Sequence, residues 1–284
     1  MSHNPQAASA LEFNLPGHDV LALEGRDAVA FAQAQFMNDV AALADGQWQW
    51  NGWLTPKGRV IALFALLRFD AEKLWLVLPD VLSRDLATQL QRYVFRSKVT
   101  LKPMDMCSVG SFDAPYKATG ASFAVFEEGE VELDMGGEGG PRCLQISYVP
   151  APENEEAAAR WNAADLAYGL PRLRDAQVEA WTPQQLSLDR LKAFSVKKGC
   201  YPGQEIVART HFLGQVKRGL ALFESATPFE AGSEVRADER AIGSIVSTAG
   251  SLALAVMPLD ADTASLTVGE TALTPRPLLG GLQR

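Results

Sequence analysis

The sequence predicts an α+β protein with a small all-β domain at its C-terminal end. In the N-terminal half, β-rich apolar runs alternate with segments whose apolar residues recur at helical spacing. After Gly214 the helical spacing stops, and short alternating runs such as "GLALF" and "SLALAVM" recur between turn residues. With 284 residues, 47% of them hydrophobic and 21% charged, the chain is long enough for two or three globular domains.

The N-terminal half is expected to form a sheet covered by helices. The run "DVLALEG" at 19–25 is typical of a strand, and a helix over 27–43 is predicted because Val29, Phe36 and Val40 lie at helical spacing. The other elements predicted for this half are strands at 59–69 and 73–79, a helix over 82–93 and a strand at 98–103.

The middle of the chain is less regular. Residues 108–140 have a mixed pattern that includes the loop-like "GGEGG" at 136–140, and a strand is predicted at 143–149. A helix over 152–168 has the acidic start that a helix dipole favours. Thr182 and Pro183 predict a short helix that ends near Phe194, and the all-β part is expected to begin at 210–215.

Charge and hydropathy exclude several classes of protein. The net charge of −8 and the pI near 5.0 argue against broad nucleic-acid binding, which requires a concentrated basic surface. The longest apolar run, "VIALFALL", is too short to span a bilayer, and the first ten residues lack a signal-peptide pattern, so we expect a soluble cytoplasmic protein.

The sequence contains two clusters of basic residues. We interpret both as solvated faces, and a pocket for a small anion is the alternative. The clusters are Arg92, Arg96, Lys98 and Lys102, and Lys192, Lys197, Lys198, Arg209, Lys217 and Arg218.

The cysteines predict neither a disulfide framework nor a metal site. Cys107, Cys143 and Cys200 are odd in number, widely spaced and without a C-x-x-C pair. Cys200 lies in "KKGCYPGQE", where Pro202 suits a first helical turn, so a helix N-terminus and the adjacent lysines would favour its thiolate. A buried, inert thiol is the alternative from local context, and Cys107 and Cys143 are expected to be structural.

The segment around Cys200 resembles a known family signature. "KGCYPGQEIVAR", followed by "GQVKRGL", is similar to the K-G-C-Y-x-G-Q-E motif of the YgfZ family, folate-binding relatives of the glycine-cleavage T-protein. "LEGRDAVAFAQAQFMNDVAAL" resembles the family's opening L-x-G-x-D-x-x-x-F-x-Q-x-Q-x-x-N-D-V, and "LTPKGRVIALFALLRF" and "SKVTL" resemble strands that follow it. Only residues 108–150 are weakly matched.

The resemblance implies three domains arranged like a cloverleaf around a central cavity, with tetrahydrofolate or a derivative bound near the middle. We expect α+β domains at 1–105 and 106–212, interleaved with each other, and a β-barrel at 213–284. The implied function is an accessory role in assembling or repairing iron–sulfur clusters, including those of radical enzymes that methylthiolate tRNA. The expected partners are iron–sulfur assembly factors or client enzymes, with no direct nucleic-acid or membrane contact, and a monomer is expected.

The same resemblance assigns the candidate site residues. Cys200 is the functional thiol, and Trp161, on the predicted helix, matches a tryptophan that relatives place against folate, although an ordinary core aromatic is the alternative reading. The remaining motif residues are Lys198, Gly199, Tyr201, Gly203, Gln204 and Glu205, and the expected folate contacts are Asn38, Asp39, Trp161 and Tyr201.

Two positions depart from the related patterns. Where the T-protein has paired aspartates, this chain has Ala62 and Leu63, which cannot accept a proton or stabilise an iminium. Where family members often carry an acid in E-x-G-x-P, "AYGLP" has Ala167, so folate binding is expected to be weakened or to use another acceptor. The first departure disfavours an aminomethyl or one-carbon transferase.

A thiol-dependent hydrolase is the third alternative. Such an enzyme needs a histidine base, but only His211 lies near Cys200 in sequence and no orienting residue is identified.

Overall fold

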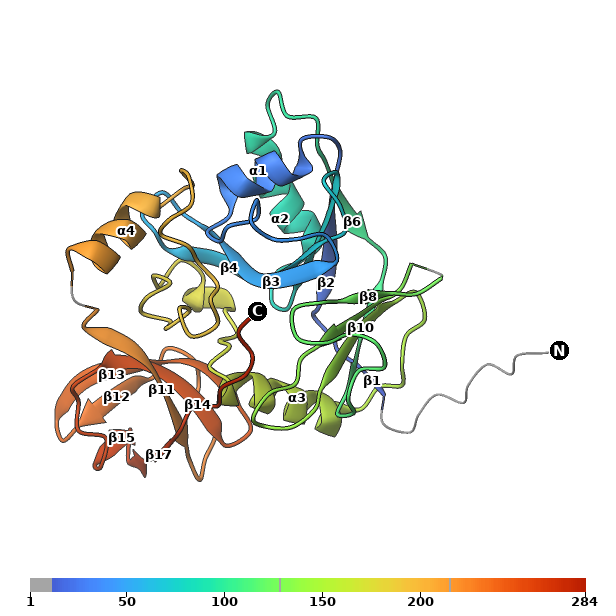
Figure 1. Ribbon diagram of the computed structural model, residues 1–284. Helices are drawn as coiled ribbons and strands as arrows, with labels where there is room; N and C mark the ends of the chain where they lie inside the picture. Colours follow the sequence, from blue (N-terminus) through green and yellow to red (C-terminus); the bar gives the residue numbers. More distant parts are fainter. Residues whose placement is uncertain (1–11, 128, 215) are drawn as a thin grey trace.

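The computed structural model describes residues 12–127, 129–214 and 216–284, so His3 and the rest of the first eleven residues lie outside the described part. It contains three antiparallel sheets, two with helices against them and one that curls on itself (Figure 1). The predicted α+β class is confirmed.

The first sheet has the strand order β3-β4-β5-β2-β6. Neighbouring side chains along β4 point to opposite faces, so Phe64 packs toward the helices while Leu63 and Ala65 face the middle of the molecule. Its elements are β2 (Asp19–Glu24), α1 (Ala28–Gln35), β3 (Gln47–Leu54), β4 (Val60–Arg68), β5 (Lys73–Leu78), α2 (Ser83–Leu90), η1 (Gln91–Tyr93) and β6 (Thr100–Met104).

Two features of this sheet differ from the prediction. The helix expected over 27–43 ends at Gln35, because Phe36 is extended (φ −99°, ψ 156°) and residues 36–39 turn to meet distant segments. Strand β3 was not predicted, since "QWQWNGWL" is buried on both faces and the polar Gln49 and Asn51 interrupt its apolar pattern.

The second sheet has the order β1-β7-β10-β9-β8 and packs against α3. Strand β1 comes from the start of the described chain and pairs with β7 (Phe13 opposite Gly110). The second sheet therefore combines one segment that precedes the first sheet in the sequence with segments that follow it. Asn154 caps α3 by accepting a hydrogen bond from the Ala157 N–H at 3.0 Å. The elements are β1 (Phe13–Asn14), β7 (Cys107–Ser111), β8 (Ala124–Val125), β9 (Val131–Asp134), β10 (Cys143–Ser147) and α3 (Glu155–Ala167).

The helix predicted over 182–194 is wrong. This segment is a succession of turns in which Ser187 and Lys192 adopt positive φ (47° and 53°), which interrupts any helix. Its buried side chains include Leu186, Leu188 and Leu191, which pack in the hydrophobic core that the sheets share. Tertiary packing therefore overrides the local helix-start signal. The helices of this region are η2 (Asp175–Gln177) and α4 (Gln204–Phe212).

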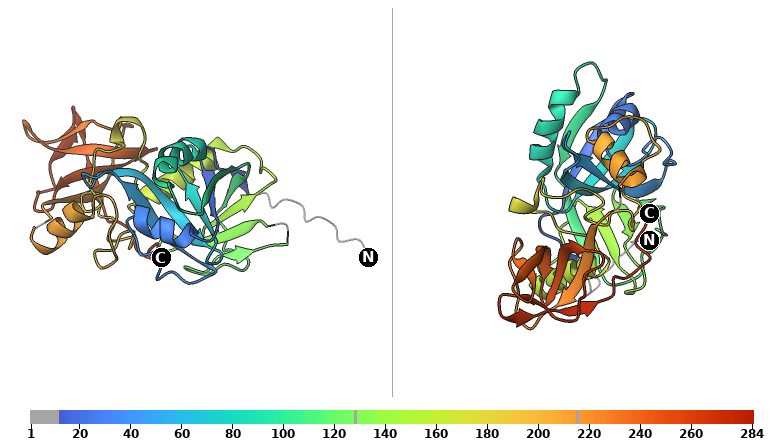
Figure 2. Two further views of the ribbon diagram at one scale, coloured as in Figure 1. Left: turned by 90° about the horizontal axis from the view of Figure 1, so that it is seen from above. Right: turned by 90° about the vertical axis from the view of Figure 1, so that its left-hand side faces the viewer.

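The third sheet confirms the predicted all-β end of the chain. Its seven strands follow the order β16-β15-β12-β13-β14-β11-β17 and form a nearly closed barrel at one side of the molecule (Figure 2). Strands β13 and β14 of this barrel contact α3. The strands are β11 (Arg218–Glu224), β12 (Glu234–Ala237), β13 (Arg240–Ala249), β14 (Leu252–Pro258), β15 (Leu266–Val268), β16 (Thr271–Ala272) and β17 (Thr274–Arg276).

The end of the chain returns from the barrel to the middle of the molecule (Figure 1). There Leu282 is 1% exposed and belongs to the same hydrophobic core as Trp50 of the first sheet, Leu144 of the second and Leu222 of the barrel. Within the described ranges, no helix has the length and apolar character needed to cross a membrane.

Candidate functional site

Lys198 joins the cysteine motif to the end of α1. Its side chain is buried, and its ammonium donates hydrogen bonds to the carbonyl oxygens of Gln33 (2.6 Å), Phe36 (2.6 Å) and Asn38 (3.0 Å). The last carbonyls of a helix lack partners within the helix, and its dipole favours a cation there. Burial lowers the pKa of Lys198 to about 8, and the nearby Asp39 carboxylate opposes that shift.

Asn38 and Asp39 shape the turn that receives Lys198. The Asn38 amide donates to the carbonyls of Trp50 (2.9 Å) and Lys192 (2.7 Å), and its backbone N–H donates to Asn51 Oδ1 (2.9 Å). Asp39 Oδ1 accepts from Gln33 Nε2 at 3.0 Å. These bonds give both residues a structural role, and a folate contact for them stays a prediction.

Tyr201 and Gln204 close the loop around Cys200. The Tyr201 hydroxyl donates to the Ser195 carbonyl (3.2 Å), and its ring lies 5.0 Å from Lys198 Nζ. Burial raises the pKa of Tyr201 to about 12. Gln204 Nε2 donates to the Lys198 carbonyl (2.9 Å), which ties the start of α4 to the start of the motif.

Gly203 permits the close approach of this loop to the first sheet. It is the N-cap of α4 in the left-handed conformation (φ 80°). A Cβ there would lie 2.6 Å from the Thr55 carbonyl oxygen and 2.7 Å from the Gly58 Cα. Any side chain at this position would therefore push apart the loop and the turn between β3 and β4.

Cys200 is exposed, whereas Cys143 is buried and Cys107 is half-buried. Burial raises the pKa of the Cys143 thiol to about 12, and the Glu132 carboxylate adds to the shift. Gly199 leaves open space beside Cys200, since among the described residues other than Gly199 and its two chain neighbours no heavy atom lies within 4 Å of where a Gly199 Cβ would stand. Glu205 is exposed in the first turn of α4.

The expected electrostatic surroundings of Cys200 need two corrections. Pro202 precedes the N-cap Gly203, so α4 begins at Gln204 and Cys200 lies further from the helix start than expected. Lys198 directs its ammonium to the three carbonyls at the end of α1, which leaves Lys197 as the exposed lysine of the pair.

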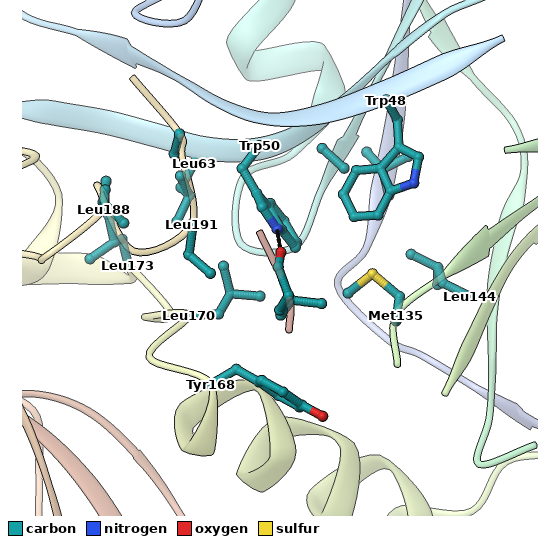
Figure 3. Close-up of a cluster of buried hydrophobic side chains, with 14 of the residues drawn as sticks. Trp48, Trp50, Leu63, Met135, Leu144, Tyr168, Leu170, Leu173, Leu188 and Leu191 are labelled. Atoms are coloured by element: carbon teal, nitrogen blue, oxygen red, sulfur yellow. Dashed lines mark hydrogen bonds between the residues drawn. The ribbon is translucent and has the colours of Figure 1, made fainter. Parts of the chain in front are cut away.

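Ala62 and Leu63, the positions expected to correspond to the T-protein aspartates, face different sides of the first sheet. Ala62 packs into the core beneath the helices, whereas Leu63 belongs to the central core and is 5% exposed. Figure 3 shows Leu63 pointing toward Trp50, Leu191 and Leu170. The position where the resemblance to the T-protein led us to expect an aspartate therefore has an apolar side chain that faces the centre of the molecule.

Trp161 lies on α3 and is fully buried. Its ring contacts Phe13 (6.1 Å between centroids) and the Arg142 guanidinium (4.7 Å). The indole Nε1 has no hydrogen-bond partner among the residues that the structure describes. The burial agrees with a core role, and contact with a ligand stays a prediction.

Sequence reasoning missed the residues that fill the centre. Trp48, Trp50 and Tyr168 converge there from β3 and the end of α3 (Figure 3), and Trp50 Nε1 donates to the Leu282 carbonyl at 2.9 Å. Ala167 accepts a hydrogen bond from the Leu279 N–H at 2.9 Å through its carbonyl. The sequence does contain an apolar run, "PLLGGL", after the last strand. The pattern of this run does not show that it packs at the centre of the molecule.

Comparison with known proteins agrees with this architecture. The profile of the CAF17 C-terminal beta-barrel domain matches residues 215–278. A "tRNA-modifying protein YgfZ" of Shigella sonnei is 30% identical over 246 residues, which cover 77% of this chain and 74% of that protein. This chain belongs to the YgfZ family.

Other comparisons extend the match. The YgfZ protein of Klebsiella pneumoniae is 29% identical over 239 residues, covering 76% of this chain and 73% of that protein. Among solved structures, the glycine cleavage system aminomethyltransferase T of Bartonella henselae aligns with a TM-score of 0.72 at 14% identity, covering 94% of this chain and 84% of that one. The YgfZ family chain described here thus has the fold of an aminomethyltransferase.

Proposed function

We propose that this YgfZ family member is a folate-binding accessory protein that supports iron–sulfur cluster assembly or repair in client enzymes, with Cys200 as its functional thiol. Relatives carry the name "tRNA-modifying protein", which supports clients among tRNA-modifying radical enzymes. We further propose that it acts in the cytoplasm, as a monomer, with assembly factors or client enzymes as partners. We also propose that it consists of domains at 1–105 and 106–212, interleaved with each other, and a third domain at 213–284.

The observation that carries the proposal is how the motif residues are used. Lys198, Tyr201, Gly203 and Gln204 all hold the loop in place through buried or part-buried contacts, whereas Cys200 is exposed beside open space. A loop that only filled space would bury its thiol, as the chain does with Cys143. The arrangement supports a thiol presented to a partner.

The folate is proposed to bind at the centre of the molecule, which in this structure is packed by core side chains and by Leu282. Trp48, Trp50 and Tyr168 offer flat aromatic walls for the pterin and benzoyl rings. Within the described part of the chain, the buried Trp161 Nε1 and Arg142 Nη2 lack hydrogen-bond partners and could serve acceptor atoms of a ligand. A bound reduced folate would supply ring nitrogens that carry one-carbon groups.

Two alternatives are less well supported. Aminomethyl transfer lacks a carboxylate at Ala62 and Leu63, although the fold is that of an aminomethyltransferase. A thiol hydrolase needs a base near Cys200, yet His211 lies at the far end of α4, about 10 Å along the helix from its start. His18 is buried, and burial together with the Arg172 charge lowers its pKa.

Genetic complementation tests the thiol. The wild-type protein is expected to restore iron–sulfur enzyme activity and tRNA methylthiolation in a bacterial strain that lacks its own family member, while Cys200→Ser fails and Cys107→Ser succeeds. Full rescue by Cys200→Ser would make the motif a purely structural loop. Folate binding is tested by calorimetry with tetrahydrofolate and its polyglutamates, and the absence of heat at about millimolar ligand would refute that part.

A further inference from the structure

The C-terminal segment 277–284 occupies the middle of the molecule. It follows β17, leaves the barrel and runs between the sheets (Figure 1). Leu282 is 1% exposed and packs in the central core with Trp50, Leu170 and Leu191. The profile of the barrel domain ends at residue 278, just before this segment enters the centre.

The segment is held by hydrogen bonds to several parts of the protein. Gly280 exchanges two bonds with Glu138, one between backbone groups (3.1 Å) and one from its N–H to the carboxylate (2.7 Å). Arg190 donates to the Leu279 carbonyl at 3.0 Å, and Trp50 Nε1 donates to the Leu282 carbonyl at 2.9 Å. These partners would all be released if the segment left.

The "GGEGG" loop at 136–140, predicted as a loop, packs closely against this segment. A Cβ on Gly137 would lie 2.8 Å from the Tyr168 ring and 2.9 Å from the Gly280 carbonyl oxygen. On the other side, Gly281 adopts φ 94° and its Cβ position lies 3.0 Å from the Gly137 Cα. Glycines in the loop and in the segment therefore allow the two backbones to lie in direct contact.

The Arg284 guanidinium lies over the Trp48 ring and donates hydrogen bonds to nearby backbone carbonyls. Its Cζ lies 5.5 Å from the Trp48 ring centroid, and Nη2 donates to the carbonyls of Asp134 (3.0 Å) and Gly136 (2.9 Å). The carbonyl between them, that of Met135, accepts from Arg142 Nε at 3.2 Å. This stretch of backbone thus offers two carbonyl oxygens to one NH2 group of a planar guanidinium.

A pterin contains a planar guanidine, as Arg284 does, but it carries no charge. The 2-amino-4-oxo ring of a pterin contains a planar, cyclic guanidine whose N–H groups suit the carbonyls of Asp134 and Gly136. Its ring face suits Trp48, and its oxo group suits an indole donor such as Trp50 Nε1. The backbone carbonyls would also provide the acceptors that the family's acid supplies where this chain has Ala167.

We propose that residues 279–284 are an internal occupant of the central ligand site, and that a 2-amino-4-oxo heterocycle displaces them by taking the place of the Arg284 guanidinium. This inference rests on the proposed folate binding and adds a subsite and a competitor to it. Because ligand and segment compete, the apparent affinity is reduced by the fraction of protein in which the segment is seated.

The test compares binding of pterin with that of lumazine, its 2,4-dioxo analogue, by calorimetry. A chain that ends at Leu278 and the Arg284→Ala variant are each expected to bind pterin about 10-fold more tightly than the parent. Lumazine, which places an oxygen where the 2-amino group would donate, is expected to bind the shortened chain about 10-fold more weakly than pterin. Arg276→Ala is the matched control, since it removes the same charge from the exposed pair with Glu224 and should leave binding unchanged.

A reversible tether tests displacement directly. In a Cys200→Ser background, Glu138→Cys with Gly280→Cys would join the loop to the segment, because a Gly280 Cβ would lie 3.2 Å from the Glu138 Cδ. The oxidised form is expected to lose pterin binding and to regain it on reduction. The tether also decides the matter if the shortened chain does not fold, as judged by its melting curve.

The outcomes separate the two proposals. Equal pterin affinity for the parent, the oxidised tether and Arg284→Ala would overturn the competition while leaving folate binding intact. Equal binding of lumazine and pterin would overturn the assignment of the guanidine edge. If neither tetrahydrofolate nor pterin binds the parent, the reduced tether or Arg284→Ala, the folate proposal fails and the inference fails with it.

Discussion

The backbone of Gly203 lies directly against that of Gly58, so that a Cβ on Gly203 would stand 2.7 Å from the Gly58 Cα. The cysteine motif is thereby pressed onto the turn between β3 and β4, more than a hundred residues earlier in the chain. Two glycines that look like ordinary loop residues in the sequence thus set how closely α4 approaches the first sheet.

Gly203→Ala is expected to lower the free energy of unfolding by about 2–4 kcal/mol, because it combines left-handed strain with a backbone clash. Gly199→Ala, four positions earlier in open space, is the matched control and is expected to change stability by less than about 1 kcal/mol. Urea denaturation of the two variants measures the difference. Equal effects would mean that the close approach is not required.

The Lys198 ammonium should make stability depend on alkaline pH. Its pKa is lowered to about 8 in the folded protein, so between about pH 8 and 10.5 the unfolded chain binds the extra proton and stability rises with pH. Relative to Lys198→Met, the wild type is expected to gain about 2–3 kcal/mol across that window.

The pKa of Lys198 can be measured independently by NMR titration of 13C-labelled lysine side chains. A value at or above 10.5 would contradict the prediction and would mean that the three carbonyl bonds outweigh the cost of burial.

Alkylation should distinguish the three thiols. At neutral pH, Cys200 is expected to react at least about 100-fold faster than Cys143, which is buried and has a pKa raised to about 12. Mass spectrometry after timed labelling measures both rates, and labelling in urea serves as the reference in which all three thiols are free. Comparable rates in the folded protein would refute the assignment of Cys200 as the accessible thiol.

The protein is expected to lack aminomethyltransferase activity. No ammonia should be released from an aminomethylated lipoyl carrier in the presence of tetrahydrofolate, because Leu63 supplies no carboxylate at the centre. Ammonia release that depends on this chain would contradict the expectation.

Introducing the carboxylate should cost stability rather than create activity. Leu63→Asp is expected to lower the free energy of unfolding by about 3 kcal/mol or more at neutral pH, since the charge would be buried among apolar side chains. Leu63→Asn, of similar size but uncharged, is the control and should be less destabilised. If Asp and Asn have equal effects at pH 7, the centre is more polar than the packing indicates.

The α+β class, the all-β end and the strands β2, β4 and β5 could be predicted from local patterns, because each has enough apolar residues at one spacing to be recognised. It also marked Cys200 and the residues around it through their resemblance to a family. Helix α3 was predictable for a similar reason, since its acidic start and the glycine after it are local signals.

Other features depend on partners far along the chain and become visible only in the folded molecule. The end of α1 at Gln35, the buried strand β3 and the turns at 182–194 follow from contacts between sheets, and the use of Lys198 as a clasp follows from carbonyls about 160 residues away. The seating of Leu282 and Arg284 at the centre could not be read from the sequence either. A Gly-Gly segment is free to take many paths, and only the packed sheets present the aromatic wall and the carbonyls that select one of them.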